Sequence, residues 1–159
     1  MSSRVIVAIR VAATRARAFD VFTREIDLWW QPSPLFAFTP GTPGRLTFER
    51  RLGGRLVEAR EDGSSFEIGR IVEWTPGEVL VFTWRQSTFP DDRTTEVSVR
   101  FDAVGDETRV TVEHRGWDGI PQEHVARHGF PNAIFLQRHG EWWQTLLGGV
   151  GRRIRDAGV

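Results

Sequence analysis

The stretch "AIFLQRHGEWWQTLLGGVGRRIR", residues 133–155, decides how this chain folds. Projected at 100° per residue, its apolar positions form one broad stripe along a long helix. The residues of that stripe are Phe135, Leu136, His139, Trp142, Trp143, Leu146, Leu147, Val150 and Ile154. Glycine is a poor helix residue, so we expect a close packing contact or a loosened last turn at Gly148, Gly149 and Gly151. A helix with one apolar face must cover a second apolar layer.

That second layer is predicted in the middle of the chain, where alternating segments are separated by turn residues. Three pairs of segments read as strands that turn at Gly53–Gly54, at Pro76–Gly77 and at Gly105–Asp106. The pairs are "GRLTFERRL" with "RLVEARE", "FEIGRIVEWTP" with "GEVLVFTWRQ", and "TTEVSVRFDAV" with "TRVTVEHRGW". Their regular spacing predicts an antiparallel meander.

The chain begins with one more strand and a helix. "RVIVAIRV" (4–11) alternates as a strand, and Thr14 is placed to cap a helix over "RARAFDVFTREIDLWW" (15–30). A Gly- and Pro-containing stretch from Asp118 to Asn132 is expected to hold one short helix. The sequence therefore predicts a single α+β domain over residues 1–159, with a curved antiparallel sheet wrapped around the C-terminal helix.

Composition narrows the classes of partner. The chain has 21 basic and 21 acidic residues, so its zero net charge gives no reason to expect nucleic acid or a membrane surface as a partner. It has no cysteine, hence no disulfide or thiolate site. The N-terminal residues form no signal-peptide core, and we expect a cytoplasmic protein. Near neutrality also permits a homodimer.

Four segments in order carry a resemblance to a known family. They are "AFDVFTREIDLWWQPSP", "GRIVEWTPGEVLVFTW", "ETRVTVEHRGW" and "WWQTLLGGV". Together they resemble the homologues of the activator of heat-shock-protein-90 ATPase, within the START-like or SRPBCC superfamily. The resemblance implies the helix-grip, birch-pollen-allergen-like fold, with a cavity between sheet and C-terminal helix. Trp142 departs from the family, which usually has glycine there, and adds bulk beside that cavity.

Two histidines are the polar candidates for a site. Strand alternation places His114 on the face of Val110 and Val112, which a helix-grip sheet turns toward its cavity. His139 lies in the middle of the helix stripe and is expected to approach His114 from the helix side. They are either polar handles on a ligand, or a general base, or a neutral pair that packs the core.

The rest of the candidate site is aromatic and aliphatic. Phe82 and Trp84 share an inward strand face with Leu80, and the chain has seven tryptophans, some of which are expected to line a cavity. The ligand-binding candidates are His114, His139, Trp84, Phe82, Val112, Trp143 and Trp30. Arg70 shares, by alternation, the face of Ile68, and either reaches the interior or extends to solvent.

No metal or cofactor is expected. His124 and His128 have the i, i+4 spacing of helical metal ligands, but they lack the HExxH pattern. No nucleophile elbow, phosphate loop or dinucleotide fingerprint is present.

The sequence therefore predicts binding of a small, largely apolar molecule in the sheet–helix cavity. The resemblance also allows a cofactor-independent cyclase or dehydratase of the polyketide-cyclase-like branch, using a cavity histidine as acid or base. A third reading is a chaperone-associated module.

Overall fold

The computed structural model describes residues 4–31, 38, 43–89, 93–117, 120 and 132–157. Within them, seven strands form one antiparallel sheet in the order β1-β7-β6-β5-β4-β3-β2. The strands are β1 (Arg4–Val11), β2 (Arg45–Phe48), β3 (Arg55–Ala59), β4 (Ser65–Thr75), β5 (Val79–Trp84), β6 (Thr95–Val104) and β7 (Glu107–Arg115). The helices are α1 (Arg15–Arg24), α2 (Ile26–Trp29) and α3 (Asn132–Ala157).

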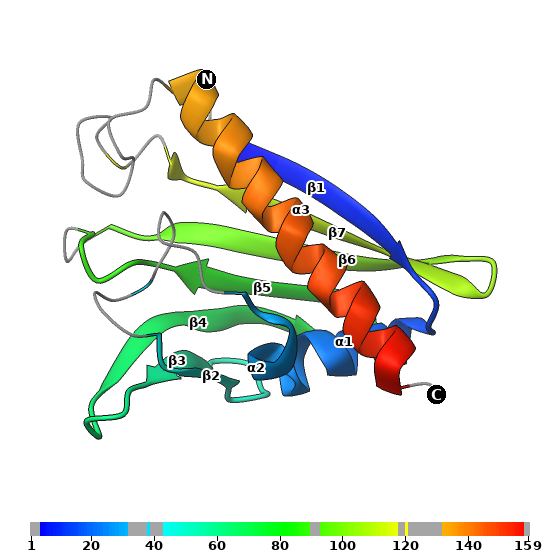
Figure 1. Ribbon diagram of the computed structural model, residues 1–159, viewed down its shortest axis with the longest axis horizontal. Helices are drawn as coiled ribbons and strands as arrows, with labels where there is room; N and C mark the ends of the chain where they lie inside the picture. The colour runs from blue at the N-terminus through cyan, green and yellow to red at the C-terminus, as the bar shows by residue number, and fades with distance from the viewer. Residues whose placement is uncertain are drawn as a thin grey trace.

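The sheet curls around α3, which runs diagonally across one of its faces (Figure 1). This is the predicted α+β helix-grip architecture, with a short helical segment after the first strand, so the fold prediction is confirmed. The three predicted strand pairs are all present and antiparallel. The short helix expected between Asp118 and Asn132 lies outside the described residues, as do His124 and His128.

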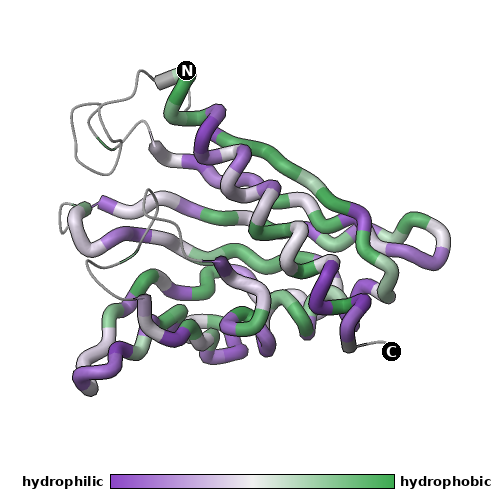
Figure 2. The backbone as a smooth tube through the Cα atoms, viewed as in Figure 1, coloured by the Kyte–Doolittle hydropathy of each residue, from purple (hydrophilic) through white to green (hydrophobic). Residues whose placement is uncertain are grey.

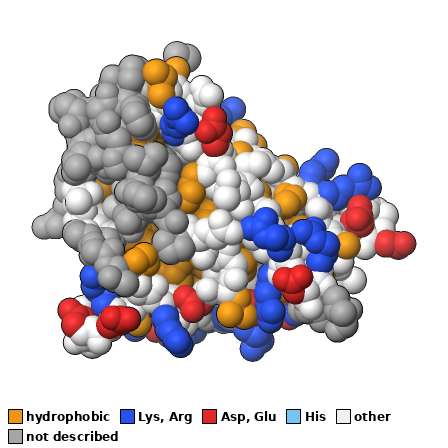
Figure 3. Space-filling model, viewed as in Figure 1, with side chains coloured by type: hydrophobic (Ala, Val, Ile, Leu, Met, Phe, Trp, Pro, Cys, Tyr) orange, Lys and Arg blue, Asp and Glu red, His pale blue; other side chains and the backbone are white. Residues whose placement is uncertain are grey.

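The register of the sheet builds an apolar inner face. Phe82 lies opposite Val97, Val97 lies opposite His114, and His114 lies opposite Val5. These four side chains are buried, as the alternation along each strand predicts. Hydrophobic residues run along the central strands, whereas the turn between β3 and β4 is hydrophilic (Figure 2). Figure 3 shows charged side chains gathered along the lower and right edges of the face that α3 crosses.

The apolar stripe of α3 faces the sheet as predicted. Phe135, Trp143, Leu146 and Leu147 are fully buried in the same core as the strand residues. The expected close contact is present at Gly149, where an added Cβ would lie 2.5 Å from the carbonyl oxygen of Trp29. The helix therefore approaches the backbone of α2 more closely than a side chain would permit. None of the described helices is long and apolar enough to cross a membrane.

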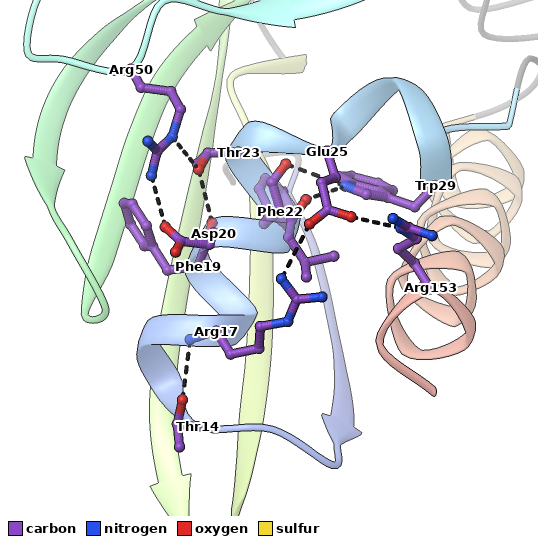
Figure 4. Close-up of polar contacts among 11 residues, drawn as sticks. Thr14, Arg17, Phe19, Asp20, Phe22, Thr23, Glu25, Trp29, Arg50 and Arg153 are labelled. Atoms are coloured by element: carbon purple, nitrogen blue, oxygen red, sulfur yellow. Dashed lines mark hydrogen bonds and ion pairs between the residues drawn. The ribbon is translucent and has the colours of Figure 1, made fainter. Parts of the chain in front are cut away.

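The helix predicted over residues 15–30 is broken into α1 and α2 at Glu25. Thr14 is its N-cap, because the Thr14 hydroxyl accepts a hydrogen bond of 3.2 Å from the backbone N–H of Arg17. The Glu25 carboxylate bridges two elements (Figure 4): it accepts from Arg17 at 3.2 Å and from Arg153 of α3 at 2.6 Å. Trp29 donates its Nε1–H back to the carbonyl oxygen of Val21 at 3.0 Å. These contacts fix the break in the helix and fasten it to α3.

Candidate functional site

Two buried histidines meet between the sheet and α3. His114 on β7 and His139 on α3 are both 0% exposed. The Nε2 of His139 lies 2.8 Å from the Nδ1 of His114, which is hydrogen-bond distance. The prediction that His139 approaches His114 from the helix side is therefore confirmed.

The partners of this pair determine where its protons lie. Trp143 donates its Nε1–H to the Nδ1 of His114 at 3.1 Å, and an indole N–H can only donate, so that Nδ1 is unprotonated. A neutral His114 then carries its proton on Nε2, which lies 2.7 Å from the hydroxyl oxygen of Thr95. The Thr95 hydroxyl in turn donates to the carbonyl oxygen of Trp84 at 2.9 Å. Since the Nδ1 of His114 accepts, His139 must donate its Nε2–H, and both rings are Nε2–H tautomers.

Both rings are neutral at pH 7. Burial lowers the pKa of His114 well below its usual value of 6.5, and the nearby His139 lowers it further. Burial alone lowers the pKa of His139 to about 3. Removing an imidazolium from water without a carboxylate partner is costly, so the uncharged form is the stable one here.

Aromatic rings surround the pair. The Trp84 ring lies 4.6 Å from His114, and the Trp117 ring lies 5.2 Å from His114 and 5.0 Å from His139, measured between centroids. Phe135 stacks on His139 at 5.7 Å, and Trp142 lies 5.5 Å from it. We call His114, His139, Trp84, Trp117, Phe135, Trp142 and Trp143 the aromatic–histidine cluster. It lies at the end of the sheet where β5 and β7 finish, beneath the first turns of α3 (Figure 1).

The structure brings four of the seven predicted site residues directly together: His114, His139, Trp84 and Trp143. Trp30 lies at the border of the cluster, half-buried, with its ring 5.4 Å from Trp142 and 5.8 Å from Trp143.

The other two predicted site residues, Phe82 and Val112, are buried outside the cluster. Phe82 stands two strands away from His114 and packs against Phe48 at 5.2 Å. Val112 lies opposite Val99, and this pair is the neighbour, along the strands, of the inward-facing pair formed by His114 and Val97. That His114 borders an internal cavity stays a prediction.

Four residues of this region were not predicted as site residues: Thr95, Trp117, Phe135 and Trp142, although Trp142 was expected to add bulk beside the cavity. The Thr95 hydroxyl oxygen accepts a hydrogen bond from the Nε2–H of His114, and the rings of Trp117, Phe135 and Trp142 surround the imidazole rings. A signal for Thr95 was present, because alternation along β6 places it on the inward face with Val97 and Val99. No pattern in the sequence predicts where the Trp117 side chain lies, because Trp117 follows the end of β7 and strand alternation does not extend to it.

No group of three or more His, Cys, Asp or Glu side chains among the described residues is arranged to hold a metal ion. The polar side-chain atoms of the aromatic–histidine cluster are indole N–H groups and imidazole nitrogens, and its other side-chain atoms are carbon. Such an arrangement can enclose an uncharged ring system and offer it a small number of hydrogen bonds.

Comparison with known proteins identifies a family and several similar structures. The family model described as activator of Hsp90 ATPase homolog 1-like protein matches residues 12–147. No match was found among curated protein sequences. An anthrahydroquino-gamma-pyrone synthase, Txn09, solved in complex with SUM, is 30% identical, with 94% of this chain and 95% of that chain covered and a TM-score of 0.55.

Two further structures are more distant in sequence. CalU16 from Micromonospora echinospora is 20% identical, with 97% of this chain and 75% of that chain covered and a TM-score of 0.64. The Aha1 dimer from Colwellia psychrerythraea is 14% identical, with 95% of each chain covered and a TM-score of 0.65. At these identities the likeness shows a shared fold and nothing about activity.

Proposed function

Since this chain belongs to the activator of Hsp90 ATPase homolog 1-like family, we propose that it binds a small, largely apolar aromatic molecule between the curved sheet and α3. The observation that carries the proposal is the aromatic–histidine cluster, in which uncharged rings gather around two neutral imidazoles. Sites for small molecules are mostly apolar and aromatic, with a few polar groups that fix orientation.

The position of the cluster supports the same proposal. It lies between two layers, the sheet and α3, rather than within one. Trp30 extends its aromatic surface outward, because the half-buried Trp30 ring contacts both Trp142 and Trp143. A flat ligand that entered beside Trp30 would meet aromatic faces and edges on several sides, an arrangement that favours stacking.

An enzyme of the cyclase type is the second candidate. The observation that favours it is the 30% identity over nearly the whole chain to a protein described as a synthase. The geometry argues against a histidine as its acid or base. Both nitrogens of His114 are already hydrogen-bonded inside the protein, and a His139 pKa of about 3 describes a weak base. Such an enzyme would act by holding its substrate in a reactive conformation.

The test of the binding proposal uses fluorene as a flat apolar probe. We expect fluorene to quench tryptophan emission and to shift the indole N–H signals of Trp142 and Trp143 in nitrogen-15 NMR spectra. Trp30→Ala should weaken fluorene binding roughly five- to tenfold, because an aromatic contact at the border of the site is lost. The matched control is Trp74→Ala, which removes another half-buried tryptophan that contacts Phe19 at 4.9 Å.

Two results would contradict the binding proposal. One is the absence of saturable fluorene binding. The other is binding that Trp74→Ala weakens and Trp30→Ala does not, since the probe would then occupy another part of the molecule.

A further inference from the structure

One polar group of the cluster has no hydrogen-bond partner in the structure: the indole Nε1–H of Trp84, within the part of the chain that is described. Trp84 is 0% exposed, so bulk water does not reach this group either. The indole groups of Trp29 and Trp143 are buried equally well, and each donates a hydrogen bond to a protein acceptor. Buried polar groups are nearly always paired, so the exception at Trp84 requires an explanation.

The position of Trp84 supplies one. Its ring lies against His114 at 4.6 Å and within 6.1 Å of His139, so it belongs to the centre of the cluster. The carbonyl oxygen of Trp84 already accepts a hydrogen bond from the Thr95 hydroxyl. The indole N–H of Trp143 donates to the Nδ1 of His114. The Nε1–H of Trp84 is therefore a hydrogen-bond donor of the site that these internal bonds do not use.

We propose that the Trp84 Nε1–H donates to a carbonyl oxygen of the ligand, and that the ligand is a neutral aromatic ketone or quinone-like compound. This inference rests on the proposed binding function. An indole N–H can donate a hydrogen bond but cannot accept one. It therefore pairs with an acceptor atom of the ligand, and it cannot accept the hydrogen of a ligand hydroxyl group. A carbonyl group on a flat ring system satisfies it while the rings of the ligand contact the surrounding aromatic side chains.

Charge completes the definition of the ligand. All seven side chains of the aromatic–histidine cluster are uncharged at pH 7, because the two imidazoles are neutral. A carboxylate placed there would lose its hydration without gaining a positive partner from the cluster. A neutral carbonyl compound avoids that cost, so we expect the site to discriminate against the anionic analogue.

The experiment compares three probes that share one ring frame. Fluorenone carries a carbonyl group where fluorene carries a methylene group, and fluorene-9-carboxylate carries a negative charge. We expect fluorenone to bind roughly three- to tenfold more tightly than fluorene, the effect of one hydrogen bond to a neutral acceptor. Fluorene-9-carboxylate should bind more weakly than fluorene.

Two variants and one spectrum assign the preference to Trp84. Trp84→Phe keeps an aromatic ring but removes the N–H, so fluorenone and fluorene should bind it equally. Trp74→Phe makes the same chemical change away from the cluster and should keep the preference. In the unsubstituted protein, fluorenone should move the indole proton signal of Trp84 downfield, and fluorene should not. That measurement does not depend on whether Trp84→Phe folds.

The outcomes separate this inference from the function on which it rests. If neither fluorene nor fluorenone binds, the binding function is wrong and the inference is wrong with it. If both bind equally and the Trp84 indole proton does not move with fluorenone, binding stands and the role of Trp84 is overturned. Tighter binding of the carboxylate than of fluorene would overturn the neutral ligand class.

Discussion

At the scale of single residues, His114 is the most constrained side chain of the cluster. It accepts from Trp143 and His139 at Nδ1 and donates to Thr95 at Nε2, so all its hydrogen-bonding capacity is used inside the protein. A residue bound in this way contributes to stability directly, whatever its contribution to a ligand.

We therefore predict that His114→Ala lowers the free energy of unfolding by about 2–4 kcal/mol, because it opens a cavity and leaves the Trp143 and His139 donors unpaired. Urea unfolding followed by circular dichroism measures this loss. Thr111→Ala, three residues earlier on the outward face of β7, is the control and should change stability by less than about 0.5 kcal/mol. If His114→Ala leaves the free energy of unfolding unchanged and weakens fluorenone binding, the main role of His114 is to contact the ligand.

The lowered pKa values of the two histidines predict how stability depends on pH. In the unfolded chain a histidine has a pKa of about 6.5, whereas the folded values are well below 6.5 for His114 and about 3 for His139. As the pH falls below about 6.5, the unfolded chain binds protons that the folded chain does not, so unfolding becomes easier. Above that pH these two groups add no pH dependence.

The expected loss between pH 7.5 and pH 5.5 is about 2–3 kcal/mol for both histidines together. Urea unfolding at pH 7.5, 6.5 and 5.5 measures it, in a range where most carboxylates remain ionised. His139→Gln keeps a donor for the Nδ1 of His114 and removes one titrating group, so it should lose about half of this dependence. A stability that stays constant from pH 7.5 to pH 5.5 is incompatible with two buried neutral histidines.

Much of this site could be predicted from the sequence, but not its hydrogen bonds. Strand alternation and helical periodicity placed His114 and His139 on facing apolar surfaces, and they do meet. The tautomers depend on Trp143 and Thr95, which come from different elements, and no local pattern fixes those distances. The orphan Nε1–H of Trp84 is likewise a property of packing and has no signature in the sequence.

At the scale of elements, the contact between α3 and α2 is the tightest that the glycines of α3 make. Gly149 allows the helix to approach the carbonyl oxygen of Trp29, where a Cβ would lie only 2.5 Å away. At the neighbouring Gly148 the nearest atom to such a Cβ is a mobile end of Arg152, at 3.5 Å. The two adjacent glycines therefore form a matched pair for mutation.

We predict opposite effects for the two substitutions. Gly148→Ala should raise the free energy of unfolding by about 0.5–1 kcal/mol, because alanine is the better helix residue. Gly149→Ala should lower it by about 1–3 kcal/mol, since the new methyl group must push α2 and α3 apart. Thermal and urea unfolding of both variants measure the difference. If both substitutions raised the free energy of unfolding, the prediction for Gly149 would be wrong, and α2 would move away from the new methyl group at little cost.

Strand β4 shows where sequence patterns fail at this scale. Simple alternation places Arg70 on the face of Ile68, yet Ile68 is buried, while Arg70 is exposed and pairs with Glu67 at 3.1 Å. The pairing of β3 with β4 shifts register between Leu56 and Val57, next to this point. Strand existence and pairing were predictable from alternation and turns. The register shift and the break at Glu25 depend on contacts between elements, which a local pattern does not contain.

At the scale of the whole molecule, the homodimer expected from composition stays a prediction. The large hydrophobic residues most exposed in the described chain are Ile6, Leu28, Leu52, Val72 and Ile134, which come from different elements. Sedimentation at micromolar concentration should show a species of twice the 18.1 kDa chain mass. A single 18.1 kDa species throughout the concentration range would contradict the expectation.

The pairing of β1 with β7 has a consequence for how the chain is made. Arg4 lies opposite Arg115, so β1 is not fully paired until about 110 further residues have been synthesised. α3, which contacts the other side of β1 through Gln144 and the Ala8 carbonyl oxygen, follows later still. During translation β1 is thus an unpaired apolar strand for several seconds or more. Folding to completion must wait for the C-terminal helix, and a nascent chain stalled before it would expose the edge that the finished protein covers.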